Sequence, residues 1–165
     1  MGSKLVVLIG HPNVGKSVIF NFFTGGRAQV SNYPGTTVEI TRGRLIRGDL
    51  HLEFLDTPGI YSLCPLTAEE AITRRILWEA KPDLLIHVID GKNLVRSLPL
   101  TFQLQETGLP LLLNMNMMDE AAKLGLSFDL NGLEKILGLK VIPTVSTKGQ
   151  GMEQLLQQVM NHVNL

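Results

Sequence analysis

Residues 10–17 read GHPNVGKS, which fits the pattern G-x-x-x-x-G-K-[ST] of a glycine-rich phosphate-binding turn. The apolar run KLVVLIG at 4–10 predicts a strand before this turn, and KSVIFNFFT at 16–24 predicts a helix after it. Gly10 and Gly15 allow backbone N–H groups to turn toward phosphate oxygens, and the helix N-terminus adds the positive end of its dipole. A glycine turn that binds nothing is the alternative, but the motif and both flanking elements agree. We therefore expect a phosphate loop at residues 10–17.

The end of the phosphate loop carries the side chains that would meet the phosphates and a metal ion. Lys16 would reach the β- and γ-phosphates of a nucleotide, and the hydroxyl of Ser17 would ligate Mg²⁺. The nucleotide contacts expected from this part of the chain are Gly10, Asn13, Val14, Gly15, Lys16, Ser17 and Val18.

A second motif, DTPG at residues 56–59, stands at the end of a predicted strand. The Asp56 carboxylate could hold Mg²⁺ through water, and the Gly59 N–H could meet the γ-phosphate. By itself the motif would be an ordinary Asp-Pro-Gly turn, and the phosphate loop upstream favours the functional interpretation. In many GTPases a glutamine after this glycine orients the attacking water, whereas this chain has Ile60. An alkyl group can neither orient water nor accept a proton, so other groups must do this work.

Two further motifs predict the binding of a guanine base. In NMMD at 116–119, the Asp119 carboxylate suits the N1 and N2 donors of guanine, and Asn116 would contact the purine edge and brace the loop. Met117 stands where a base-stacking lysine is more common, so stacking would be apolar. An alternative is that Asn116 and Asp119 only cap a helix. In the later segment VSTKGQG, the backbone N–H groups expected on the guanine carbonyl are those of Ser146, Thr147 and Lys148.

Short apolar runs alternate with longer helical patterns along the whole chain, which predicts an α/β fold. The order fits a three-layer sandwich around a six-stranded, mostly parallel sheet, with one antiparallel strand from a hairpin that turns at Gly48 and Asp49. Thr67 and Glu70 form a capping-box pattern at the start of a helix. The polar segment at 27–39 has no periodicity, and we expect it to be a functional loop.

Composition sets limits on the domain count and on the partners. A length of 165 residues with 44% hydrophobic content suits one domain. Fifteen Lys and Arg balance 15 Asp and Glu, so no charge pattern points to a nucleic-acid partner. The apolar runs are strand-sized and shorter than the roughly 20 residues that span a bilayer, so we expect the chain to be soluble. The single cysteine, Cys64, excludes an intrachain disulfide, and we expect it to be a small filler at least half buried.

The motifs in this order resemble a GTPase of the translation-factor-related (TRAFAC) class with the Ras-like P-loop fold. The phosphate loop with FNFFTG also resembles the ribosome-assembly GTPases of the Era and Der type, so it does not decide the family. NYPGTTVE at 32–39, the first switch, and DTPGIYSL at 56–63, the second switch, resemble together with NMMD the N-terminal G domain of the FeoB ferrous iron transport family. Val38 and Glu39 favour this family over Era-like switches.

The resemblance implies a mechanism in which cations replace the missing glutamine. Thr37 aligns with the threonine that binds Mg²⁺ and the γ-phosphate, and Asn13 aligns with a ligand of an activating K⁺ ion. The carbonyls of Ser31 and Tyr33 would complete the K⁺ site. The alternative is that Asn13 only braces the loop by hydrogen bonds to switch backbone. The residues expected to act in hydrolysis are Asn13, Lys16, Thr37 and Gly59.

The resemblance also implies a setting for residues 1–165, which we interpret as a single excised G domain. Members of the family carry a helical domain and a polytopic Fe²⁺-permease segment after the G domain, and neither is in this chain. The implied function is GTP hydrolysis that powers or regulates Fe²⁺ uptake at the cytoplasmic face of the bacterial inner membrane. GTP or GDP, Mg²⁺ and K⁺ are the implied cofactors. The permease segment of the same polypeptide is the implied partner, and the assembly could be a homo-oligomer.

Overall fold

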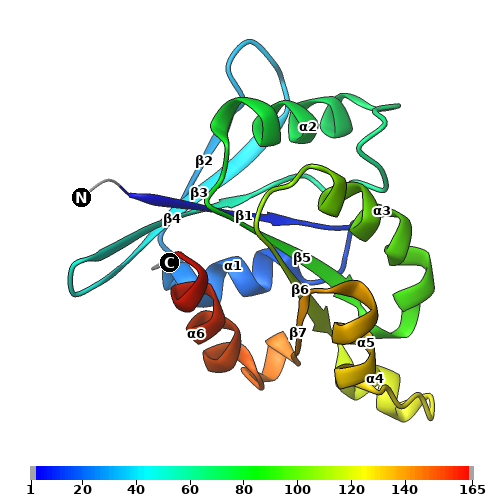
Figure 1. The fold of residues 1–165 in the computed structure, drawn as a ribbon. Helices are drawn as coiled ribbons and strands as arrows, with labels where there is room; N and C mark the ends of the chain where they lie inside the picture. Colours follow the sequence, from blue (N-terminus) through cyan, green and yellow to red (C-terminus); the bar gives the residue numbers. More distant parts are fainter. Residues whose placement is uncertain (1–2, 164–165) are drawn as a thin grey trace.

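The structure, a computed structural model, describes residues 3–163 and centres on one seven-stranded sheet (Figure 1). Strand β1 (Lys4–Ile9) lies inside this sheet and pairs in parallel with β4 (Leu50–Asp56) and with β5 (Leu84–Asp90). The strand order is β2-β3-β4-β1-β5-β6-β7. The remaining strands are β2 (Ala28–Asn32), β3 (Glu39–Arg47), β6 (Leu111–Asn116) and β7 (Lys140–Pro143).

Strand β3 alone runs against the others, because it is antiparallel to both β2 and β4 while every other pair is parallel. The predicted α/β class, the mostly parallel sheet and the single antiparallel strand are confirmed. The predicted count of six strands was wrong by one, because β2 lies in the segment that we expected to be a loop. All five β2 residues are exposed at the sheet edge, so backbone pairing with β3, and not an apolar pattern, defines this strand.

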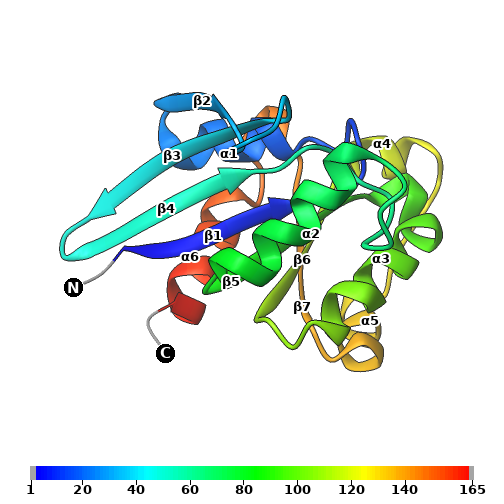
Figure 2. The same cartoon turned by 90° about the horizontal axis from the view of Figure 1, so that it is seen from above.

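Helices cover both faces of the sheet, which gives the three layers (Figures 1 and 2). One face carries α1 (Lys16–Thr24) and α6 (Met152–Val163), and the other carries α2 (Ala68–Ala80) and α3 (Leu94–Glu106). Helix α5 (Leu130–Leu137) extends this second layer beside β6 and β7. The short helices are η1 (Gly91–Asn93), α4 (Met118–Lys123) and η2 (Ser146–Lys148).

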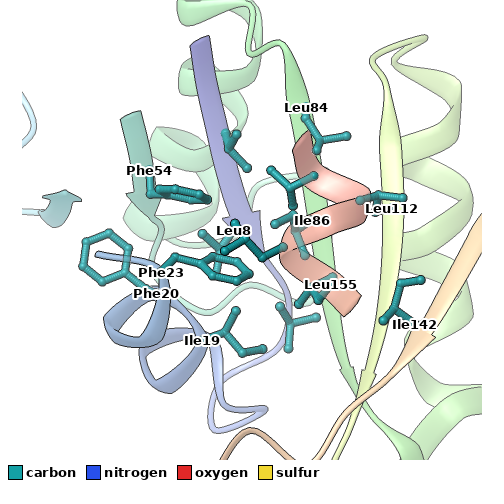
Figure 3. Packing of buried hydrophobic residues seen from close by; sticks show 14 of the residues in the cluster. Leu8, Ile19, Phe20, Phe23, Phe54, Leu84, Ile86, Leu112, Ile142 and Leu155 are labelled. Atoms are coloured by element: carbon teal, nitrogen blue, oxygen red, sulfur yellow. The ribbon is translucent and has the colours of Figure 1, made fainter. Parts of the chain in front are cut away.

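Strand β1 connects the two main cores because its side chains alternate between the sheet faces. Val6 and Leu8 pack against α1 and α6, whereas Val7 and Ile9 pack against α2 and α3. Figure 3 shows the first core, in which Phe20 and Phe23 of α1 approach Leu8 and Phe54. Burial on both faces fixes the direction of β1, and therefore the place where its carboxyl end delivers the phosphate loop.

The glycine turns and the helix cap predicted from the sequence are present, whereas the predicted burial of Cys64 is not. Gly25 ends α1 with a φ of 62°, and Gly48, with a φ of 58°, turns the chain from β3 to β4. Thr67 caps α2 by accepting a hydrogen bond from the Glu70 N–H, as the capping box requires. The prediction that Cys64 is at least half buried was wrong, because this residue is exposed in the loop before α2.

Between residues 3 and 163, no helix is both long and apolar enough to cross a bilayer. In the same residues, His, Cys, Asp and Glu side chains nowhere form a group of three that could hold a metal ion.

Candidate functional site

A cavity of about 390 Å³ lies where the phosphate loop meets the ends of β6 and β7. It is lined by Asn13, Gly15, Lys16, Ser17, Val18, Asn116, Met117, Asp119, Glu120, Val145, Ser146 and Thr147. The structure therefore brings together three motifs that are far apart in the sequence. A larger groove of about 840 Å³ lies between the end of α1 and the β2–β3 hairpin, but none of the predicted site residues lines it. We assign the functional site to the smaller cavity for this reason.

The two motif glycines of the phosphate loop are required by close backbone contacts. A Cβ atom on Gly10 would lie 2.2 Å from the carbonyl oxygen of Val88, and one on Gly15 would lie 2.3 Å from Asn116 Nδ2. Gly15 also has a φ of 95°, in the region that side chains rarely adopt. The loop can therefore approach β5 and β6 only with glycine at these positions. Gly10 and Val14 shape the loop but do not line the cavity.

Lys16 is buried at the base of the cavity with only 7% of its surface exposed. Its ammonium group makes no hydrogen bond or ion pair with the residues that the structure describes. Burial lowers the pKa of Lys16, and the nearby Asp56 carboxylate only partly opposes this effect. Because Lys16 lines the cavity and its ammonium group has no acceptor among the described residues, the arrangement favours an anion such as a phosphate at this point.

Ser17 and Asp56 form the pair of oxygen donors that a magnesium ion would need. The Ser17 hydroxyl donates a 2.6 Å hydrogen bond to Asp56 Oδ2. The other carboxylate oxygen, Oδ1, is buried and has no partner among the described residues. Burial raises the pKa of Asp56, while the Ser17 hydroxyl and Lys16 lower it. A hydroxyl beside a carboxylate with one unused oxygen fits Mg²⁺, which prefers oxygen ligands and keeps several waters.

The second switch lies directly against the phosphate loop. The Thr57 hydroxyl donates to the Leu8 carbonyl at 2.9 Å, and the Ile60 N–H donates to the Gly10 carbonyl at 2.9 Å. Ile60 is fully buried in the core beneath α2 and α3. The position of the usual glutamine is therefore part of the hydrophobic core in this chain.

Asn116 connects the two sides of the cavity and is 1% exposed. Its Nδ2 group donates to the Val14 carbonyl and to Ser146 Oγ, both at 2.9 Å. Its Oδ1 atom accepts from the Thr144 hydroxyl and from the Ser146 N–H, both at 3.0 Å. Because these bonds use both donors and both lone pairs of the amide, the structure places Asn116 as the brace between loops. The predicted contact of Asn116 with the purine edge stays a prediction.

Asp119 and Met117 provide the polar and the apolar surface for a base. Lys148 Nζ lies 2.7 Å from Asp119 Oδ2, and this hydrogen bond is the main cause that lowers the pKa of Asp119. The carboxylate is therefore ionised, as the recognition of two guanine N–H groups requires. Met117 lines the cavity in a left-handed conformation with a φ of 59°.

The loop after β7 gives fewer free backbone donors than expected. The Ser146 N–H donates to Asn116, and the Lys148 N–H donates to the Val145 carbonyl at 3.0 Å. Of the predicted trio, only Thr147 has an N–H group that no bond within residues 3–163 uses, and Thr147 lines the cavity. Lys148 contributes its side chain, through Asp119, instead of lining the cavity itself.

The first switch is not part of the cavity. Ser31 belongs to the exposed strand β2, and Thr37 is exposed at the tip of the β2–β3 hairpin. The Tyr33 hydroxyl donates to Glu79 of α2 at 2.8 Å, and the guanidinium of Arg75 lies 5.5 Å from the centre of the Tyr33 ring. The Tyr33 carbonyl accepts from the N–H of Thr36 at 3.0 Å and from its hydroxyl at 2.9 Å. Figure 1 shows this tip on the α2 side of the sheet, across from α1. The roles of Ser31, Tyr33 and Thr37 stay predictions.

Thr144 and Asn114 were missed in the sequence as supporting residues, and Glu70, named there for its capping box, also supports the second switch. Thr144 accepts from Asn114 Nδ2 at 2.9 Å, so its own proton is directed to Asn116. Glu70 accepts from the backbone of Tyr61 and Leu66 and thereby anchors the second switch to α2. Asn114 within the apolar run LLLNMN was the available signal for the first network, because a buried amide needs partners.

Known proteins share both the sequence and the fold. A family model described as ferrous iron transport protein B matches residues 4–159. A relative from Porphyromonas gingivalis, named Fe(2+) transport protein A/Fe(2+) transporter FeoB fusion protein, is 45% identical over 94% of this chain and 19% of its own length. The FeoB G domain from Methanococcus jannaschii, at 39% identity, has a TM-score of 0.87 with 100% of both chains covered. The cytosolic domain of T. maritima FeoB in a GDP form, at 34% identity, also has a TM-score of 0.87, over 100% of this chain and 65% of that one.

These matches show the family of the chain, and they cover only part of each curated relative. The chain spans about a fifth of the length of the curated FeoB relatives that it matches. The resemblance to Era and Der type GTPases rested on the phosphate loop alone, whereas the FeoB match extends over nearly all described elements. The chain therefore belongs to the ferrous iron transport protein B family, and its sequence and fold both correspond to the G domain of FeoB.

Proposed function

We propose that residues 1–165 form a single G domain that binds and hydrolyses GTP and thereby powers or regulates Fe²⁺ passage through a membrane permease. The observation that carries the nucleotide part is the cavity itself. Lys16, whose side chain is largely buried and whose ammonium group has no partner among the described residues, lies at one end of it, and the ionised Asp119 lies at the other. A phosphate chain and a guanine base have these two complementary properties.

The reaction is the transfer of the γ-phosphoryl group to water, in which positioning and charge neutralisation do most of the work. Mg²⁺, held by Ser17 and Asp56 and by Thr37 once the first switch closes, would neutralise charge on the β- and γ-phosphates. Backbone groups near Thr37 and Gly59 would hold the attacking water, because Ile60 is buried in the core. Lys16 would stabilise the charge on the β–γ bridge.

A K⁺ ion is the proposed substitute for an arginine finger, with Asn13 as its side-chain ligand. Asn13 is exposed, has a φ of 62°, and its amide makes no hydrogen bond with the described residues. The alternative role as a brace of switch backbone therefore has no support in this conformation. Completion of the site by the carbonyls of Ser31 and Tyr33 would require the first switch to leave α2 and to close over the cavity.

The test measures steady-state GTP turnover in matched KCl and NaCl for the wild type and for Asn13→Ala. We expect the wild type to be faster in K⁺ by about tenfold or more, because one well-placed charge acts at the transition state. Asn13→Ala should abolish the difference while GDP affinity stays within about twofold, since this affinity depends on Asp119 and Lys16. Equal wild-type rates in the two salts would overturn the K⁺ proposal, and no turnover with Mg²⁺ present would overturn the GTPase proposal.

The proposed partner of the G domain is the permease segment of the parent polypeptide. The permease segment of the parent polypeptide would receive the signal at the cytoplasmic face of the membrane, and homo-oligomer formation by the parent protein stays a prediction. The relatives named as Fe(2+) transporters support the iron part. Within residues 3–163 there is no group of three His, Cys, Asp or Glu side chains that could hold a metal ion, and the role that we propose for this domain is nucleotide-dependent control.

A further inference from the structure

We propose that His11 is a positioning residue that stacks on Tyr61 and thereby holds the Gly59 N–H beside the γ-phosphate. The phosphate loop and the second switch would then act as one unit. This inference rests on the proposed GTPase function, and it assigns the work of the missing glutamine to a backbone donor that side-chain packing keeps in place.

Three successive contacts join the two segments. A Cβ atom on Gly59 would lie 2.6 Å from the backbone of Pro12, so this peptide unit is already pressed against the phosphate loop. The next residue, Ile60, donates to Gly10 at 2.9 Å. The residue after it, Tyr61, places its ring centre 4.8 Å from that of His11, with 46° between the ring planes. Each of residues 59–61 of the second switch therefore contacts one of residues 10–12 of the phosphate loop.

The stack continues beyond the pair to α3. The guanidinium carbon of Arg96 lies 5.5 Å from the centre of the Tyr61 ring, on an aromatic surface that favours cations. His11 is 8% exposed, and its ring makes no hydrogen bond with the described residues. The tilted packing against Tyr61 is the aromatic contact that the structure gives to the His11 side chain.

The ring of Tyr61, and not its hydroxyl, makes the contact. Tyr61 is 52% exposed, and within residues 3–163 its hydroxyl has no hydrogen-bond partner. Its N–H donates to Glu70 Oε1 at 3.2 Å, so its backbone is tied to α2 while its ring is tied to the phosphate loop. Tyr61→Phe keeps every contact that the proposal uses, whereas Tyr61→Ala removes the stack.

The chemistry explains why such a stack is needed. A glycine N–H can stabilise a developing charge only where it is held, because a mobile donor must be reoriented at the moment of reaction. Gly59 has no side chain that could fix it. The two residues that follow Gly59 hold it in place instead. Ile60 is anchored in the core, and the ring of Tyr61 packs against His11 nearer the surface.

The experiment compares His11→Ala, Tyr61→Ala, Tyr61→Phe and the His11→Ala/Tyr61→Ala double variant. We expect kcat to fall about tenfold in each single alanine variant, and no further in the double variant, because both remove one contact. Tyr61→Phe should keep the wild-type kcat, and GDP affinity should stay within about twofold throughout, since every variant keeps Lys16 and Asp119, on which this affinity depends. Trp78→Ala is the matched control, because Trp78 is an aromatic residue of similar exposure, 55%, on α2, paired with Arg74 and not with the second switch.

A second measurement does not depend on turnover. Amide hydrogen exchange of the nucleotide-free protein should become faster at Gly59 and Ile60 in His11→Ala and Tyr61→Ala, and stay unchanged in Tyr61→Phe and Trp78→Ala. If the wild type shows no hydrolysis, the proposed function fails, and this exchange pattern alone decides the stack. Unchanged exchange in both alanine variants, a Tyr61→Phe as slow in turnover as Tyr61→Ala, or single effects that multiply in the double variant would each overturn the proposal.

Discussion

The base end of the cavity and the first switch are built in opposite ways. At the base end, Asn116 is buried and its four hydrogen bonds join the phosphate loop to the segment after β7. In the first switch, Thr37 is exposed, and the segment is held away from the cavity by Tyr33 on α2. Protein contacts alone thus organise the base end, whereas the first switch has no contact with the cavity. Changes at the base end should therefore alter affinity for both nucleotides, and changes in the first switch should alter only what GTP does.

Lys16→Met should have the largest effect on binding. Removal of the charge that meets the phosphates should cost about 4 kcal/mol, close to a thousandfold in affinity for GTP and GDP alike. The nucleotide-free protein should become more stable, because burial lowers the pKa of Lys16 and so penalises its charged form in the folded state. This penalty is complete below the lowered pKa of the folded state, diminishes as pH rises above it, and is absent above the ordinary lysine value. Titration calorimetry and thermal unfolding measure both effects, and a variant less stable than the wild type would contradict the argument.

Asp119→Asn tests whether the base end recognises guanine through the carboxylate. An amide would leave one guanine N–H opposite a donor, so GTP affinity should fall about a hundredfold. Xanthosine triphosphate, with a carbonyl in place of the guanine amino group, should bind this variant better than GTP does. The variant also loses the ion pair with Lys148, so Lys148→Met serves as the control. Equal preference of wild type and variant for the two nucleotides would exclude Asp119 as the specificity residue.

Asn116→Ala shortens a side chain at the base end of the cavity, and Thr37→Ala shortens one in the first switch. Asn116→Ala leaves Val14, Thr144 and Ser146 without partners and should lower the free energy of unfolding by about 3 kcal/mol. Thr37→Ala should leave the unfolding free energy within about 0.5 kcal/mol, because its side chain is exposed. Urea unfolding without nucleotide separates the two outcomes. A similar loss in both variants would show that the two regions are equally organised.

Tyr33→Phe should have the smallest effect on stability and the most selective one on turnover. It removes the hydrogen bond to Glu79 but keeps the ring beside Arg75, so the unfolding midpoint should move by less than about 2 °C. The first switch should leave α2 more readily, so GTP turnover should rise by about twofold while GDP affinity stays the same. Glu79→Gln is a second way to weaken the same contact. Slower turnover in both variants would mean that this contact belongs to the active conformation.

The local sequence pattern predicted the strands and helices whose buried residues recur with the period of that element. It failed for segments whose structure depends on contacts with distant parts of the chain. Strand β1 and the phosphate loop could be predicted because an apolar run, two glycines and a helix follow in order. Strand β2 could not, because all of its residues are exposed and only its partner β3 defines it. The position of Tyr33 on α2 joins residues that are 46 apart in sequence, and no spacing rule indicates it.

The site shows the same division between local and distant information. Motif spacing indicated Lys16, Ser17 and Asp119 because their chemistry is carried by single side chains. It did not indicate Thr144, whose role is to direct one proton between two asparagines. It also overestimated the loop after β7, because two of the three expected donors are already used within the fold.

The left-handed backbone at Asn13 and Met117 has a consequence for the design of a more robust domain. Apart from Lys81, these are the only residues other than glycine in the described chain with a positive φ, and both line the cavity. Each is expected to cost about 1 kcal/mol that glycine at the same place would largely avoid. A screen for heat resistance alone would thus be drawn to Asn13→Gly and Met117→Gly. Such variants would survive the heating and lose the two side chains that face the nucleotide.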